Sequence, residues 1–166
     1  MRILLLVLTT FLASCGTMEY AYQRDMDRVR MQDVHAIADT ILSYQKRHNS
    51  FPFQQEAVNA PVEVFISDRK LPEWLKEQMP KTGHSYRTHE ELEAELRTVE
   101  GEDYILPSEP QRVETFAPNF YQYHVQPDYM CVSANLYFAN KDTQSVQGQY
   151  YKYQLCAKSD DEGAEA

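Results

Sequence analysis

The architecture of this chain follows from residues 24–52, which read RDMDRVRMQDVHAIADTILSYQKRHNSFP. Apolar side chains recur there at the spacing of one helical face, as Val34, Ile37, Ala38, Ile41 and Tyr44. Acidic residues come early and basic residues late, as the helix dipole favours, and Asn49 and Pro52 supply a stop. The pattern predicts an amphipathic helix of about twenty-five residues, roughly 37 Å long, whose apolar stripe needs a second layer to cover it.

The last third of the chain predicts that second layer. Polar and apolar residues alternate in three runs, at 120–125, 130–136 and 150–156. In the second and third runs the apolar residues share one face, and Cys131 and Cys156 lie on the opposite, polar face. We therefore expect an α+β fold in which the long N-terminal helix packs on a C-terminal antiparallel β-meander.

The two cysteines also predict how these runs pair. If Cys131 lies opposite Cys156 in an antiparallel pair, the apolar residues meet as Val132 with Leu155, Ala134 with Tyr153 and Leu136 with Tyr151. Directly opposed cysteines are within reach of a disulfide, which an oxidising compartment favours. Closing a loop of about 25 residues would then contribute roughly 3 kcal/mol.

Two short helices are predicted in the middle of the chain, between the long helix and the closing strands, and the second of them lies in a helical insertion. Residues 71–80 form a proline-bounded pattern with Trp74 and Leu75 as expected core contacts. The second helix should begin after Thr88, because a glutamate three residues later gives the spacing of a capping box, and it should end at Gly101.

The other middle segments are short. Residues 62–66 predict a brief strand or a buried extended segment, and residues 104–106 predict another brief strand. Three prolines in residues 107–118 argue against a continuous helix or a central strand, so this stretch is expected to be a connector.

The N-terminus has the pattern of a targeting signal. Arg2 precedes an apolar run at 3–12 that is too short to span a bilayer, which is typical of a secretory signal peptide. Residues 12–16, Leu-Ala-Ser-Cys-Gly, resemble the lipobox of bacterial lipoproteins. That resemblance implies a signal peptide at 1–14 and acylation, such as palmitoylation, of Cys15.

The lipobox also implies how the mature protein is held. Acyl chains buried at about 0.8 kcal/mol per CH₂ would anchor it firmly without a spanning segment, and residues 15–23 would form a lipidated tether. Gly16 stands where many inner-membrane lipoproteins carry Asp, so the resemblance implies the outer membrane, with the protein facing the periplasm.

Length and charge limit the function further. Without its first 14 residues the 166-residue chain keeps 152, enough for one domain, which we place at 24–158. Its 15 basic and 25 acidic residues give a formal charge of −10, which argues against nucleic acid and against an electrostatic hold on anionic lipid. Residues 159–166 are expected to be an acidic disordered tail.

This layout resembles type IV pilin-like proteins, and in particular the globular domains of the major pseudopilins of type II secretion. Residues 24–52 resemble the periplasmic half of the family's helix, residues 71–81 its proline-bounded segment, and residues 121–136 its closing strands. The chain departs from the family at its N-terminus, where a lipobox and tether replace the prepilin-peptidase site and the apolar half-helix. Residues 82–111 look like an insertion.

No catalytic residue, metal site or cofactor is predicted. The family's calcium loop is not carried over, because residues 140–145 offer only Asp142 as a carboxylate. Of the five histidines, His84 and His89 match metal spacings poorly and are interpreted as surface residues, and His35 and His48 are interpreted as boundary residues of the long helix; His124 is the fifth. The twelve tyrosines leave two interpretations open, namely core packing with hydroxyls at the rim, or an aromatic surface for a protein or glycan partner.

These observations together predict a non-catalytic binding or assembly module, held at the membrane by acylated Cys15 and partnered by an envelope protein. The pilin resemblance implies a role accessory to a type II secretion or type IV pilus-like system. One alternative is a structural lipoprotein that binds the cell wall or another envelope protein. The other is an envelope enzyme, which would require a clustered, buried set of titratable residues in the middle segment.

Overall fold

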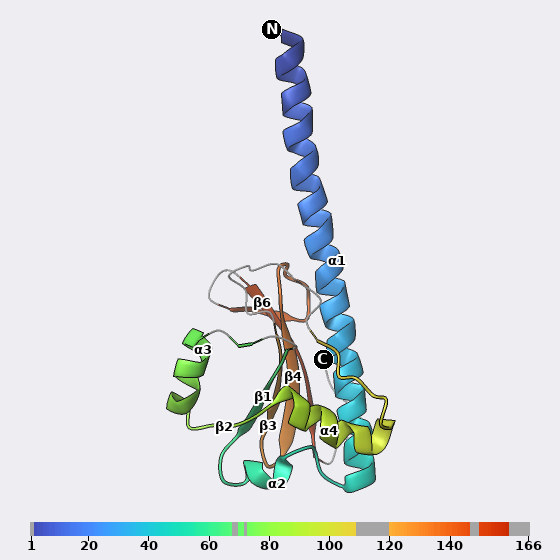
Figure 1. Ribbon diagram of the computed structural model, residues 1–166, viewed down its shortest axis with the longest axis vertical. Coiled ribbons are helices and arrows are strands. Elements are labelled where there is room, and N and C mark those ends of the chain that lie inside the picture. The colour runs from blue at the N-terminus through green and yellow to red at the C-terminus, as the bar shows by residue number, and fades with distance from the viewer. Residues whose placement is uncertain (1, 68–69, 72, 109–119, 147–149, 160–166) are drawn as a thin grey trace.

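A long helix and a twisted sheet make up the computed structural model, which describes residues 2–67, 70–71, 73–108, 120–146 and 150–159. For residues 2–17, 144–146 and 150 it describes the backbone alone. The sheet and short helices form a body against one half of the long helix, and the other half extends beyond that body (Figure 1). The predicted α+β class is confirmed.

Helix α1 (Arg2–His48) is longer than predicted. It ends where expected, because Asn49 adopts a left-handed conformation with φ of 56° and donates its N–H to Gln45 O at 2.7 Å. It does not begin near residue 24, since the backbone of residues 2–23 continues the same helix. The predicted stripe at Val34, Ile37, Ala38, Ile41 and Tyr44 is buried.

The sheet has six strands in the order β2-β1-β3-β4-β6-β5. Their bounds are β1 (Val62–Ile66), β2 (Ser85–Arg87), β3 (Tyr121–Val125), β4 (Tyr129–Leu136), β5 (Thr143–Val146) and β6 (Tyr150–Lys158). All neighbours are antiparallel except β1 and β2. The three predicted runs form an antiparallel meander as β3, β4 and β6, and the chain adds the edge strand β5 between β4 and β6.

Strands β3, β4, β6 and β1 lie where the sequence predicted them, whereas β2 and β5 were not predicted. The predicted strand at 104–106 is wrong. That segment pairs with no strand among the described residues, and its buried Leu106 instead donates its N–H to the Glu93 carboxylate at 2.8 Å.

The predicted register between β4 and β6 is confirmed. Cys131 pairs with Cys156, and the apolar pairs follow as Val132 with Leu155, Ala134 with Tyr153 and Leu136 with Tyr151. The structure joins the two cysteine sulfurs in a disulfide. The alternation of apolar residues along the two strands and the disulfide between them therefore specify the same β4–β6 register.

Helices lie on both faces of the sheet (Figure 1). The inner face, with Val62, Val64, Tyr121 and Tyr123, forms the main core together with α1 and with α4 (His89–Glu100). The outer face carries a smaller apolar cluster of Phe65, Phe120 and Leu75, the last from α3 (Glu73–Gln78).

The short helices agree with the sequence in their capping but not in every contact. The capping box of α4 is present, with Thr88 Oγ1 accepting from Glu91 N–H at 3.2 Å and the Glu91 carboxylate accepting from Thr88 N–H at 2.7 Å. Trp74, predicted as a core contact, is 51% exposed. Successive helical residues point about 100° apart, so in α3 Leu75 takes the buried position and its neighbour does not.

Two further short helices connect these elements: α2 (Gln54–Ala57) and the 3₁₀ helix η1 (Met79–Lys81). Most of the predicted connector at 107–118 and the acidic tail beyond Ser159 lie outside the described residues. Across the residues that were described, no helix combines the length and apolar character that crossing a membrane would require.

The disulfide gives the first testable prediction. Cys131→Ser should lower the free energy of unfolding by roughly 3 kcal/mol, because opening the loop restores conformational freedom to the unfolded chain. Urea denaturation of the oxidised proteins measures this difference. With both proteins fully reduced, wild type and variant should unfold at nearly the same urea concentration. Equal midpoints under oxidising conditions would contradict a stabilising role for the bond.

Candidate functional site

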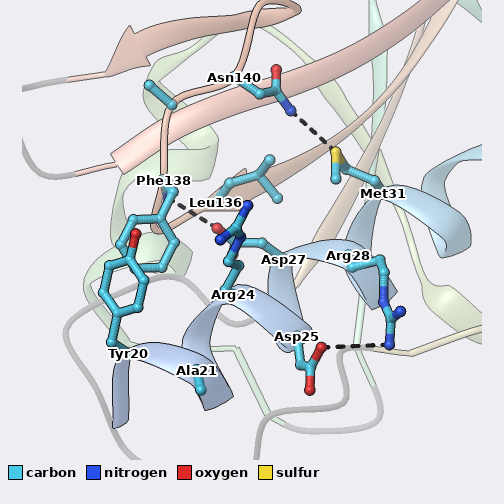
Figure 2. A pocket seen from close by; sticks show the side chains of 11 residues that line it. Tyr20, Ala21, Arg24, Asp25, Asp27, Arg28, Met31, Leu136, Phe138 and Asn140 are labelled. Carbon is cyan, nitrogen blue, oxygen red and sulfur yellow. Dashed lines mark hydrogen bonds and ion pairs between the residues drawn. The ribbon is translucent and has the colours of Figure 1, made fainter. Parts of the chain in front are cut away.

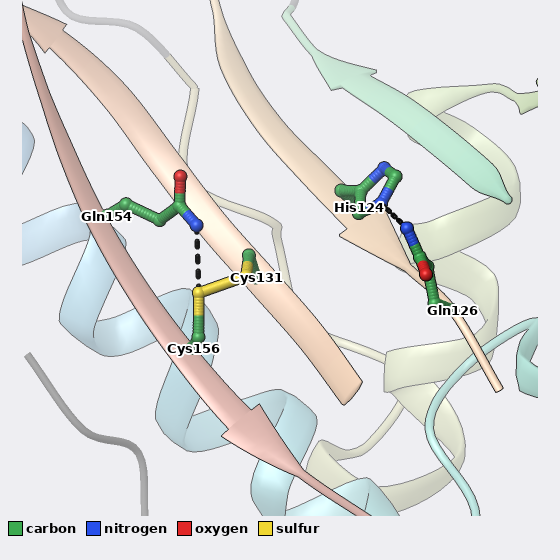
Figure 3. The surroundings of a disulfide bond; sticks show 5 residues. All are labelled: His124, Gln126, Cys131, Gln154 and Cys156. Atoms are coloured by element: carbon green, nitrogen blue, oxygen red, sulfur yellow. Dashed lines mark hydrogen bonds between the residues drawn. A yellow bond between two sulfur atoms is a disulfide. The ribbon is translucent and has the colours of Figure 1, made fainter. Parts of the chain in front are cut away.

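A row of residues with chemically reactive side chains crosses the outer face of the sheet. Tyr86 pairs with Glu63 across β2 and β1, Glu63 with His124 across β1 and β3, His124 with Cys131 across β3 and β4, and Cys131 with Cys156. Directly paired residues project from the same face of a sheet, so all five side chains lie on one side. Figure 3 shows His124 on the strand beside the disulfide.

Glu63 is the centre of this row and is only 8% exposed. Its Oε1 lies 3.0 Å from Nδ1 of His84 and 3.3 Å from Nδ1 of His124. The His84 contact has the distance of an ion pair but not the geometry of a hydrogen bond, so the buried Nδ1 has no hydrogen-bond partner among the described residues.

Local turn chemistry brings His84 to this position. After η1 the chain turns through Gly83, whose φ of 73° suits glycine, and Thr82 Oγ1 accepts the N–H of His84 at 3.2 Å. The next residue, Ser85, donates its N–H to Pro61 O at 2.9 Å and begins the parallel pairing of β2 with β1. The His84 ring therefore arrives beside the start of β1.

The charges around Glu63 keep it ionised. Burial by itself raises the pKa of Glu63, but the hydrogen bond from His124 and the charges of His84 and His124 outweigh it, so the pKa lies below its usual value. Burial, together with the Glu63 charge and despite the hydrogen bond to Thr82, raises the pKa of Tyr86 and keeps its phenol neutral.

A pocket of about 310 Å³ adjoins this cluster. Polar side chains of the outer face line one part of it: Glu63, Tyr86, Gln122, Asn135 and Lys152. Apolar side chains line the rest: Phe65, Leu75, Met79 and Phe120. Burial lowers the pKa of Lys152, and the Glu63 charge opposes that effect. The pocket is at the small end of the range for ligand sites, about 300–1,000 Å³.

A second pocket, of about 640 Å³, lies where α1 leaves the body (Figure 2). Tyr20 and Met31 line it from α1, and Phe138 and Asn140 line it from the segment after β4. The Tyr20 and Phe138 rings meet edge to face with centroids 4.7 Å apart, and the Asn140 amide donates to the Met31 sulfur at 3.1 Å.

Asp27 joins α1 to the segment that follows β4. Its carboxylate accepts the backbone N–H groups of Tyr137 at 3.0 Å and Phe138 at 2.9 Å, and it contacts Arg30 Nη1 at 2.9 Å. Asp27 is 4% exposed and Arg30 2%, and the Arg30 guanidinium also lies over the Tyr137 ring at 5.1 Å. These contacts place the second pocket beside a structural attachment point, so we take the Glu63 cluster as the candidate functional site.

The residues predicted from sequence lie in separate places. Cys15 is in the backbone-only part of α1, and Cys131 and Cys156 lie beside His124 in the row on the outer face. His35 contacts the Tyr153 hydroxyl at 2.8 Å, and His48 stacks on Tyr44 with ring centroids 4.2 Å apart.

Core packing is confirmed for several tyrosines. Tyr121 and Tyr123 are fully buried, and their hydroxyls donate to Asp33 at 2.6 Å and to Pro52 O at 2.8 Å. Burial raises the pKa of Tyr123 far above its usual value. These hydroxyls bind polar groups at the edge of the core, as the core-packing interpretation expected.

The sequence did not predict the grouping of Glu63, His84 and His124. One signal was present, because Glu63 interrupts the apolar run at 62–66 and so marks a charged side chain within a buried strand. The pairing that carries this glutamate to a histidine of β3 is long-range and has no local sequence signature.

Comparison of the chain with protein-family models, with curated proteins and with solved structures found no match.

The buried Asp27 gives the second prediction, with a matched control at Asp25, two residues earlier, which also pairs with an arginine three residues on. Asp27→Asn should destabilise the protein by about 3–5 kcal/mol, because it removes the charge that compensates buried Arg30. Asp25→Asn breaks the pair with Arg28, whose side chains are both 68% exposed, and should cost at most about 1 kcal/mol. Chemical denaturation measures both, and equal losses would contradict the attachment role of Asp27.

Proposed function

We propose that this protein is a lipid-anchored lipoprotein of the bacterial envelope that acts as a non-catalytic binding or assembly module. The observation that carries the proposal is the path of α1, which connects the lipobox at residues 12–16 to the folded body as one continuous helix (Figure 1). In this proposal acylated Cys15 is the anchor, and the helix that carries it is also a structural layer of the domain.

The geometry of α1 supports a fixed spacing rather than a loose tether. Asp27 is the first buried side chain along the part of α1 whose side chains are described, and Met18, Tyr20 and Tyr22 before it are exposed. At 1.5 Å per residue, the helix from Cys15 to Asp27 spans roughly 18 Å. An acylated Cys15 would hold the body at about that distance from the membrane surface.

The proposed setting is the outer membrane, with the body in the periplasm and an envelope protein as partner. A long helix packed on a mostly antiparallel sheet is the arrangement that the pilin resemblance implied. A role accessory to a type II secretion or type IV pilus-like system follows as the preferred context.

A second candidate, an envelope enzyme, is favoured by the cluster around Glu63. It brings a buried carboxylate, two imidazoles and, across the adjoining pocket, a lysine of lowered pKa into one region. Turnover of small ester, amide or phosphoester substrates that disappears in Glu63→Gln would favour the enzyme. Equal turnover in the wild type and in Glu63→Gln would rule out an enzyme that acts through this cluster.

Lipidation gives the third prediction. Cys15→Ala should lose the acyl mass and leave the membrane fraction, or retain its signal peptide, because the acylated thiol is missing. Mass spectrometry of the purified protein and fractionation of the envelope measure these outcomes. Cys131→Ser is the matched control and should stay acylated and membrane-bound. An acylated Cys15→Ala protein would contradict the proposal.

Crosslinking of the lipidated protein in its native envelope, followed by mass spectrometry, tests the partner. Recovery of secretion or pilus components would support the proposed context. Recovery of cell-wall fragments alone would favour the structural lipoprotein over a secretion accessory.

A further inference from the structure

We propose that Glu63, His84 and His124 bind a divalent transition-metal ion such as Zn²⁺. These three residues offer one carboxylate oxygen and two imidazole nitrogens, and the ligand atoms all lie within 4.8 Å of one another. The site adds to the proposed anchoring function and does not depend on it, because none of its residues belongs to α1.

Two of the three separations between the donor atoms are close to those around such an ion. Bonds of about 2.0–2.2 Å in a tetrahedral zinc site place neighbouring ligand atoms about 3.3–3.6 Å apart. Oε1 of Glu63 lies 3.3 Å from Nδ1 of His124 and 3.0 Å from Nδ1 of His84. Small side-chain rotations would therefore admit the ion, without a change in the strands.

His84 supplies an independent reason for a ligand at this place. Its Nδ1 is buried and has no hydrogen-bond partner among the described residues, although it points into a polar cluster. Leaving a buried polar atom unsatisfied costs about 1–3 kcal/mol. A bond from this nitrogen to a metal ion would remove that cost and would also neutralise the buried Glu63 carboxylate.

His124 is held by its surroundings in a way that suits a ligand. Its Nε2 lies 3.1 Å from the Gln126 side-chain amide (Figure 3). A metal-binding histidine usually donates its second N–H to a nearby acceptor, and rotation of the amide would turn the Gln126 oxygen toward this nitrogen. The neighbouring disulfide residue Cys131 pairs with His124 and helps to fix its strand.

The donor set determines the class of ion. Two imidazole nitrogens with one carboxylate suit Zn²⁺ and related transition metals, whereas Ca²⁺ and Mg²⁺ prefer sites made of oxygen ligands. Three protein ligands leave at least one coordination position for water or a small molecule. Glu63 also lines the pocket of about 310 Å³, so such a molecule has space beside the cluster.

Zinc titration of the full-length protein tests this site. The detergent-solubilised protein is freed of metal by chelation and titrated with Zn²⁺ in a calorimeter, with thermal unfolding measured in parallel. We expect one Zn²⁺ per chain and a rise in melting temperature when it binds. Loss of even a supporting group around a metal weakens binding by about 10–100-fold, so Glu63→Gln should weaken it at least about 10-fold.

Two further variants make the result specific. His84→Gln changes a residue outside the regular strands, so it tests the ligand set even if Glu63→Gln fails to fold, and it should also weaken binding at least about 10-fold. His89→Gln is the matched control. His89 also has a buried Nδ1 without a hydrogen bond among the described residues, but it contacts Glu93 at 3.6 Å and lies outside the cluster. It should bind Zn²⁺ as wild type does.

Co²⁺ provides a second readout, because coordination by two nitrogens and an oxygen gives visible absorption bands that should be lost in His84→Gln. Absence of Zn²⁺ binding to the folded wild type would overturn the proposal. Wild-type affinity in a folded Glu63→Gln or His84→Gln protein would overturn it too. Neither result would affect the lipidation test with Cys15→Ala.

Discussion

Burial of one stripe of α1 against the inner face of the sheet is the interaction on which the rest of the structure depends. Val34, Ile37 and Ile41 are fully buried, and each side chain of this kind contributes about 1.5–3 kcal/mol when removed from water. The stripe covers Tyr121 and Tyr123 from the sheet. Because α1 and α4 occupy that face, the polar side chains of the same strands must lie on the other one.

The outer face follows from this constraint. Successive residues of a strand point to opposite faces, so burying the apolar residues of β1 and β3 on the inner face leaves Glu63 and His124 together on the outer face. The same alternation places Cys131 next in the row. The inner core therefore fixes the geometry of the candidate site indirectly. The disulfide reinforces it by locking β4 to β6 in the register that the apolar pairs also favour.

The sequence predicted those features whose signals are local. Helical periodicity located the buried stripe of α1, Thr88 and Glu91 located the start of α4, and parity with Cys131 and Cys156 gave the β4–β6 register. The candidate site was not predicted, because Glu63 and His124 meet only through the pairing of β1 with β3, two strands that are far apart in the sequence. The exposure of Trp74 was missed for a similar reason, since the orientation of a six-residue helix depends on what it packs against.

Native-state hydrogen exchange would test directly whether α1 is both a layer of the core and an external support. Amides of residues 34–45 should exchange as slowly as those of β4 and β6, because both open only when the whole domain unfolds. Amides of residues 18–23 should exchange much faster, since none of these residues is buried. Equal, rapid exchange along the whole of residues 18–45 would contradict the dependence of the fold on α1.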